Sequence, residues 1–375
     1  MINFKQTLAR NLLSIPGYRT NRKIVVIESD DWGSIRMSSN KAISAFQKAG
    51  INLDRDPYSL YDTLESENDL NALFEVLKKF KDKKGNHPVI TANTVMANPD
   101  FDKIAASNFK EYHYELFTKT YERYYNSSNL SSLWEEGMAL NLFKPQFHGR
   151  EHVNVALWMN ALQSQNERIH LAFKYGVFGI SDKSDKSNKR NNYMAAFDFN
   201  NERELAAVNK IIKDGLSMFE SFFGFKSKSI IAPCYVWSSK CESLLNDMGV
   251  KALQGISYQS EPTIGKSKYS KKIRYTGQSN KYGQRFLVRN AFFEPTHFNG
   301  MNHITDLLNR MDIAFFWNKP LIIGSHRINY MGTLSEKNRS DNLIKLEILL
   351  KSILERHPDV EFMSTDCLVD LMLTK

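Results

Sequence analysis

Two adjacent carboxylates stand where an apolar run of this chain ends. Residues 24–27 are four consecutive β-branched residues, and Asp30 and Asp31 follow them almost at once. Such a run predicts a strand buried on both faces. Two like charges at its end repel each other unless a cation or a shared proton offsets the repulsion. The pair therefore indicates a cation site, and the plainer alternative is a helix-capping acid beside a solvated neighbour.

A second segment supplies the other ligands that such a site needs. His148 and His152 are four residues apart, a spacing that places two side chains on one face of a helix and lets both imidazoles reach one ion. One aspartate and two histidines make three ligands and leave a position for water, which is typical of a catalytic zinc site. In the plainer alternative both histidines are helix-surface or capping residues.

With three further segments the chain resembles the polysaccharide deacetylase family, the carbohydrate esterases that share the NodB homology domain. The Asp-Asp and His-x-x-x-His motifs match residues 30–31 and 148–152, and residues 232–237, 289–290 and 323–326 match the later motifs in order. The third motif lacks the family's arginine, which orients the catalytic Asp, and Arg289 or Arg150 would take over this role. In the second motif, Gly149 replaces a Ser or Thr. Long intervening segments make the chain similar to a divergent branch from bacterial surface-glycan gene clusters.

The resemblance implies metal-dependent removal of an N- or O-acetyl group from a sugar of a bacterial surface polysaccharide or its precursor. Asp31, His148 and His152 would hold the divalent ion, with zinc as the expected metal. Asp30 would be the general base, and His326 would protonate the leaving amine or alkoxide.

The resemblance also suggests which residues meet the substrate. The backbone amide of Tyr235 would face the oxyanion, and Ile323 would line the pocket for the acetyl methyl group. Trp32 and Trp237 are candidate platforms for the sugar ring, although a Trp after a strand more often caps the core. Arg289 would orient Asp30 or bind an acid group of the substrate. The expected substrate contacts are Tyr235, Trp237, Trp32, Ile323 and Arg327.

Composition fits a protein with a sizeable core. The chain has 375 residues, of which 42% are hydrophobic, and no stretch approaches the roughly 18 apolar residues of a membrane span. Without a signal-peptide pattern, we expect a cytoplasmic protein with at most weak peripheral membrane contact. Three cysteines, an odd number without paired spacing, argue against a disulfide framework or a cysteine-rich zinc site.

A formal net charge of +9 favours anionic partners. The excess is concentrated in residues 181–190 and in a basic loop over residues 260–285. These stretches are either solvated surface or contacts for an anionic glycan, a nucleotide-sugar or lipid diphosphate carrier, or an anionic membrane face. No nucleic-acid-binding motif accompanies the charge, so no nucleic-acid partner is expected.

The apolar pattern predicts alternating strands and helices in one catalytic domain over residues 1–375, with an aromatic-rich insertion over residues 100–140. No dinucleotide glycine fingerprint is present, which favours a parallel barrel over a Rossmann sheet. Every candidate site residue follows a predicted strand, and that face carries the chemistry of α/β barrels. The resemblance specifies a distorted (β/α)7 barrel. Strands are expected over residues 24–27, 88–93, 177–180, 229–232, 286–289, 321–324 and 360–363, and helices over 39–49, 67–81, 202–223, 241–248 and 341–356.

Three other functions stay open. A metal-independent glycoside hydrolase would use Asp30 and Asp31 as its carboxylate pair, although adjacent residues rarely straddle a glycosidic bond. A glycan-binding relative without catalysis would bind metal and sugar and turn nothing over. A thiol enzyme built on Cys234 would be abolished by Cys234→Ala.

Overall fold

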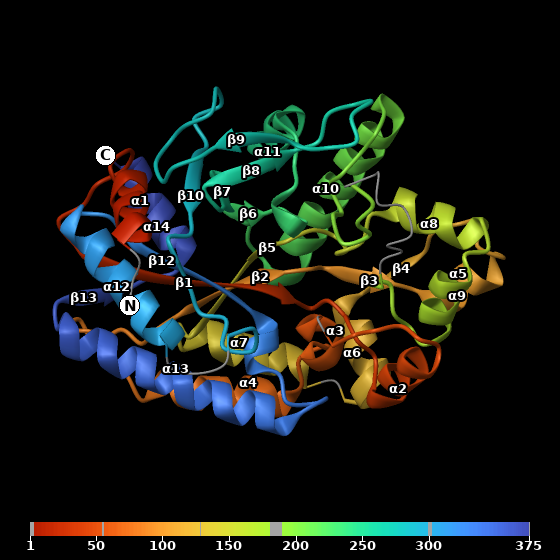
Figure 1. The fold of residues 1–375 in the computed structure, drawn as a ribbon, viewed down its shortest axis with the longest axis horizontal. Coiled ribbons are helices and arrows are strands. Elements are labelled where there is room, and N and C mark those ends of the chain that lie inside the picture. The colour runs from red at the N-terminus through yellow and green to blue at the C-terminus, as the bar shows by residue number, and fades with distance from the viewer. Residues whose placement is uncertain (1–3, 55, 128, 181–189, 299–301, 375) are drawn as a thin grey trace.

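A parallel sheet forms the centre of the molecule (Figure 1). The computed structural model describes residues 4–54, 56–127, 129–180, 190–298 and 302–374. The strand order is β10-β7-β6-β5-β2-β1-β12-β11, and β13 pairs with the first residues of β1. The strands are β1 (Lys23–Trp32), β2 (Ile90–Thr94), β5 (Phe143–Phe147), β6 (Ser229–Ile231), β7 (Ala252–Gly255), β10 (Arg285–Val288), β11 (Ala291–Phe292), β12 (Leu321–His326) and β13 (Val360–Phe362).

The two edges of this sheet are brought together by the chain itself. Strands β10 and β11 lie at opposite ends of the order, yet only Arg289 and Asn290 separate them in sequence. The sheet therefore curls round, and β10 and β11 act as two halves of one interrupted strand beside β1, β2, β5, β6, β7 and β12. This arrangement confirms the predicted distorted (β/α)7 barrel, with its distortion at the β10–β11 seam.

Helices cover the outside of the barrel, and their ends follow local sequence signals. Helix α4 begins with a capping box between Ser66 and Asp69, and α10 ends at Gly224 in the left-handed conformation. Helices α4 and α13 pack against each other below the sheet (Figure 1). The larger helices are α2 (Asn40–Lys48), α4 (Glu67–Lys78), α8 (Val155–Gln163), α9 (Glu167–Lys174), α10 (Glu202–Phe223), α11 (Glu242–Asp247), α12 (Asn302–Phe316), α13 (Glu336–Arg356) and α14 (Thr365–Leu373).

One predicted strand is absent from the structure, and one observed strand was not predicted. Residues 177–180 form no strand, and their apolar side chains are buried in a loop that packs against α2 and α9. The segment is apolar because its side chains are buried, but its backbone does not pair with a strand. Strand β7 was not predicted, because its short segment Ala-Leu-Gln-Gly carries no β-branched residue and only two clearly apolar ones.

The two segments set apart by composition have their own structure. Within residues 100–140 lie α5 (Phe101–Ala106), β4 (Tyr114–Leu116), α6 (Phe117–Tyr125) and α7 (Leu130–Ala139), and β4 pairs antiparallel with β3 (Ala97–Pro99). The basic segment contains an antiparallel ribbon of β8 (Tyr258–Glu261) and β9 (Ser270–Ile273). Residues 181–189 lie outside the described part. The remaining helices are α1 (Phe4–Ser14) and α3 (Pro57–Tyr61). None of the described helices has the length and apolar character needed to cross a bilayer.

Candidate active site

A bulge at the end of β1 turns both carboxylates toward one space. Between Ser29 and Trp32 the chain advances three residues while its partner β2 advances two, from Ala92 to Thr94. The extra residue breaks the alternation of side chains between the two faces of a strand. Asp31 takes a φ of 76° there, and Asp30 and Asp31 line the same cavity.

The two histidines do not share a helix, which corrects the sequence prediction. Strand β5 ends at Phe147, and α8 begins at Val155 behind an Asn154 cap, so both histidines lie in the connecting loop. Gly149 adopts a φ of 121°, a conformation that favours glycine and breaks any helix at that point. The loop, rather than a helical repeat, brings the imidazoles together, with ring centroids 5.0 Å apart.

The three predicted ligands converge. Asp31 Oδ1 lies 3.3 Å from Nε2 of His148 and 3.2 Å from Nε2 of His152. One ligand atom from each residue falls within 4.8 Å of the others, and all three residues are buried. Burial lowers the pKa of His152, so its ring is neutral at pH 7. Burial opposes ionisation of Asp31, but the two neighbouring imidazoles hold its pKa well below the ordinary value.

The chemistry of this donor set fits a divalent metal ion. Nδ1 of His148 lies 2.8 Å from the carbonyl oxygen of Ile231, so in the neutral ring that nitrogen carries the proton and donates it. The lone pair of Nε2 then faces the carboxylate of Asp31. Two acceptors at this distance repel unless a proton or a cation lies between them. Metal-binding histidines usually donate the proton of their other ring nitrogen to a carbonyl or carboxylate oxygen, which fixes the tautomer in this way. Two nitrogens with one oxygen suit zinc.

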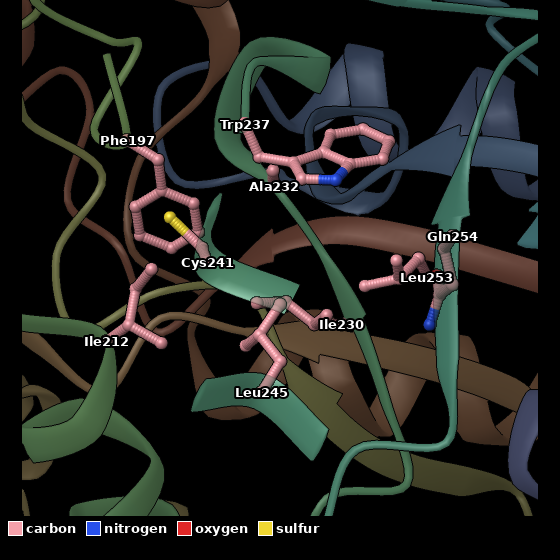
Figure 2. Close-up of a pocket in the computed structure, with 9 residues that line it drawn as sticks. All are labelled: Phe197, Ile212, Ile230, Ala232, Trp237, Cys241, Leu245, Leu253 and Gln254. Carbon is pink, nitrogen blue, oxygen red and sulfur yellow. The ribbon is translucent and has the colours of Figure 1, made fainter. Parts of the chain in front are cut away.

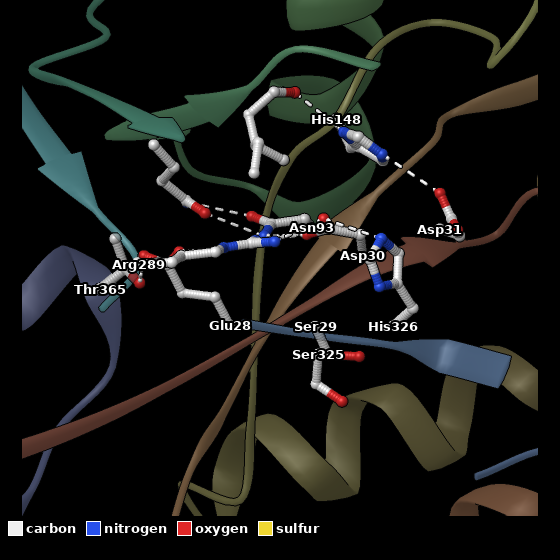
Figure 3. A network of polar contacts seen from close by, with 12 residues as sticks. Glu28, Ser29, Asp30, Asp31, Asn93, His148, Arg289, Ser325, His326 and Thr365 are labelled. Atoms are coloured by element: carbon white, nitrogen blue, oxygen red, sulfur yellow. Dashed lines mark hydrogen bonds and ion pairs between the residues drawn. The ribbon is translucent and has the colours of Figure 1, made fainter. Parts of the chain in front are cut away.

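Asp30 is held in place by a buried arginine (Figure 3). Arg289 donates to both carboxylate oxygens, at 2.7 and 2.6 Å, and its Nε donates to Glu28 at 2.8 Å. Asn93 donates to Asp30 Oδ1 at 2.8 Å. Burial acts to raise the pKa of Asp30, but the guanidinium outweighs it and lowers the pKa to about 2. Of the two arginines considered as substitutes for the missing third-motif arginine, Arg289 contacts Asp30, whereas Arg150 pairs elsewhere, with Glu151 and Asp214.

His326 lies beside Asp30, its register partner on the neighbouring strand β12, and is held charged by a residue that the sequence did not identify. Its Nε2 lies 3.7 Å from Asp30 Oδ2, and its Nδ1 lies 2.6 Å from Glu294 Oε1. Burial disfavours the imidazolium, yet Glu294 and the two aspartates raise the pKa of His326 to about 9. The imidazole is therefore protonated at neutral pH and able to donate a proton.

These groups line one cavity of about 310 Å³. Behind it, Cys234 and Tyr235 adopt left-handed φ values of 55° and 57° in a tight turn after β6, a strained conformation of the kind found at functional sites. The Tyr235 amide donates to the carbonyl oxygen of Ala232 at 2.9 Å, so it is not free for an oxyanion as the resemblance suggested. The Tyr235 hydroxyl instead lies 3.2 Å from Arg289. The residues that line the cavity are Asp30, Asp31, Arg36, Tyr58, His148, His152, Asn192, Met194, Ala232, Cys234, Tyr235 and His326.

Four predicted substrate contacts do not line this cavity. Trp32 is fully buried, with its indole donating to Ser29 at 3.0 Å. Trp237 points into a separate apolar cavity of about 10 Å³ (Figure 2), which is a small packing gap. Ile323 is a core residue of β12, and the buried guanidinium of Arg327 pairs with acidic side chains of the loop before α4. Core packing accounts for all four.

Sequence reasoning missed several residues that the fold brings to the site. Glu294 follows the apolar residues 291–293, and Asn93 stands at the end of a predicted strand, so the search for polar residues past strand ends would have found both. Arg36 and Asn192 come from loops and Tyr58 from the short helix α3, where no periodic pattern marks them.

Comparisons with known proteins show similar architecture at low identity. No family model and no curated protein sequence matches the chain. A Mycobacterium smegmatis structure described as a polysaccharide deacetylase has 9% identity and a TM-score of 0.46, with 96% of this chain and 93% of that chain covered. Puue allantoinase has 9% identity and a TM-score of 0.46, over 94% and 91%. The α-amylase AmyC of Thermotoga maritima has 9% identity and a TM-score of 0.45, over 94% and 75%. These similarities concern the fold alone.

Proposed function

We propose that this protein is a metal-dependent hydrolase that removes an N- or O-acetyl group from a sugar of a bacterial surface polysaccharide or its biosynthetic precursor. The observation that carries the proposal is the juxtaposition, in one cavity, of a three-residue metal-ligand set with an ionised carboxylate and a protonated imidazole. The motif resemblance supplies the acetylated sugar as the substrate class. The hydroxyl, amide and guanidinium groups of the cavity wall suit sugar hydroxyls.

Asp31, His148 and His152 would hold the ion, and zinc fits their donor atoms. When bound, a divalent ion would polarise the acetyl carbonyl and lower the pKa of a water molecule. Asp30, anchored by Arg289, would accept a proton from the attacking water. Because the pKa of Asp30 is about 2, this carboxylate is a weak base and can act only on a water that is already acidified.

His326 would complete the reaction by supplying the proton that the leaving group needs. As the water oxygen bonds to the acetyl carbon and the C–N or C–O bond breaks, His326 would give its Nε2 proton to the leaving nitrogen or oxygen. The products are acetate and the free amine or hydroxyl of the sugar. The proton held by Asp30 would then return to His326, whose Nε2 lies 3.7 Å away, and restore both groups.

The test combines metal content with acetate release. We expect about one equivalent of zinc or another divalent ion in the purified protein, lost in Asp31→Asn and retained in Asp30→Asn, with acetate release abolished in both. Asparagine tolerates the left-handed backbone at position 31, so folding is preserved in that variant. Activity that survives removal of the metal would instead favour a carboxylate-pair glycosidase, and bound metal without turnover of any acetylated sugar would favour a glycan-binding relative.

A further inference from the structure

Among the described residues that line the catalytic cavity, Arg36 is a cation that forms no ion pair within 4.0 Å. Asp30 pairs with Arg289 and His326 with Glu294, and the carboxylate of Asp31 belongs to the proposed metal-ligand set. Arg36, from the loop between β1 and α2, lines the same cavity. Among the described residues it makes no ion pair within 4.0 Å and no hydrogen bond, and its Nε is buried without a partner.

The surroundings hold the Arg36 guanidinium in place without neutralising it. Its Cζ lies over the ring of Tyr58, 5.1 Å from the centroid, a stacking geometry that leaves the edge of the guanidinium plane open. The side chain also lies against Gly179, where a Cβ would meet Arg36 Nε at 3.2 Å. Glycine at that position makes room for the arginine.

A half-buried guanidinium with a buried and unsatisfied Nε–H is costly unless a ligand satisfies that donor. Its planar fork matches a carboxylate or a phosphate, which accept two parallel hydrogen bonds. We propose that Arg36 binds an anionic substituent of the acetylated sugar, so that the preferred substrate is an acidic sugar, a uronic acid or a sugar phosphate. The acetylated sugar in this inference comes from the proposed function, and the negative charge of the substrate is inferred from Arg36.

Three probes that share one ring test the inference in the zinc-loaded protein by isothermal titration calorimetry. These are N-acetylglucosamine, the corresponding uronic acid, and N-acetylglucosamine 6-phosphate. At least one acidic probe is expected to bind tenfold or more tightly than the neutral sugar, and which of the two does so identifies the anion. Arg36→Gln should reduce that preference to within about twofold, and Arg36→Lys should keep part of it.

The control is Arg203→Gln, which removes the same charge from an exposed position of α10 outside the cavity and should leave the preference unchanged. Equal affinity for all three probes, no binding of either acidic probe, or a preference that persists in Arg36→Gln would overturn the inference. Acetate release is measured separately. A preference that depends on Arg36 without acetate release would refute only the proposed reaction, and acetate release without such a preference would refute only the role of Arg36.

Discussion

Replacement of Glu294 by glutamine should weaken the catalytic acid selectively at high pH. Glu294 accepts the Nδ1 proton of His326 at 2.6 Å, and its carboxylate is the strongest of the groups that favour the charged imidazole. Glutamine has nearly the same shape and keeps a hydrogen-bond acceptor, but it carries no charge. The variant therefore isolates the electrostatic contribution of Glu294.

The size of the effect follows from the pKa of His326. That pKa is raised from 6.5 to about 9, a difference worth about 3 kcal/mol at 1.36 kcal/mol per pH unit. If Glu294 accounts for most of it, the pKa in the variant falls to about 7. At pH 8 the protonated fraction then drops from about 0.9 to about 0.1, a tenfold loss of rate, whereas at pH 6 the loss is about 10%.

The assay is kcat against pH for acetate release, from pH 5.5 to 9.5. The descending limb should move from near pH 9 to near pH 7 in Glu294→Gln. Stability gives an independent readout. Because the folded-state pKa of His326 is raised, its ion pair stabilises the wild type fully below pH 6.5 and loses this effect as the pH rises through 9. The variant should show a flatter dependence across that window. A descending limb that stays near pH 9 in a folded variant would refute the reasoning.

Three further predictions concern the frame of the site. Arg289→Met should lower the free energy of unfolding in urea by about 3–5 kcal/mol, because it leaves the carboxylates of Glu28 and Asp30 buried and unpaired; a loss below 1 kcal/mol would contradict this. Gly149→Ala should cost about 1–3 kcal/mol in thermal unfolding and weaken zinc affinity, since the φ of 121° strains any L-residue between the two histidines; unchanged zinc affinity would show that the loop adapts. Cys234→Ala should retain activity, because burial of the thiol raises its pKa to about 11, although part of the residue is exposed. Loss of turnover in this variant with the metal still bound would instead support a thiol mechanism.

The sequence by itself determined the local features of the site. Four β-branched residues followed by two carboxylates specify a strand that ends at the cavity, and the two histidines four residues apart marked the segment that converges with Asp31. Helix signals were equally local, and the predicted range 202–223 coincides with α10. The strand and helix predictions succeeded because burial and capping depend on neighbours in the chain.

The tertiary structure decided what those residues meet. Arg289 reaches Asp30 across 259 residues of sequence, and Glu294 reaches His326 only because β11 and β12 pair in the sheet. The bulge that turns Asp30 and Asp31 to one side depends on the register with β2. Trp32 and Arg327 show the converse, since each follows a site motif and yet points into the core. Side-chain direction and long-range pairing arise from packing between strands, and a linear pattern does not encode them.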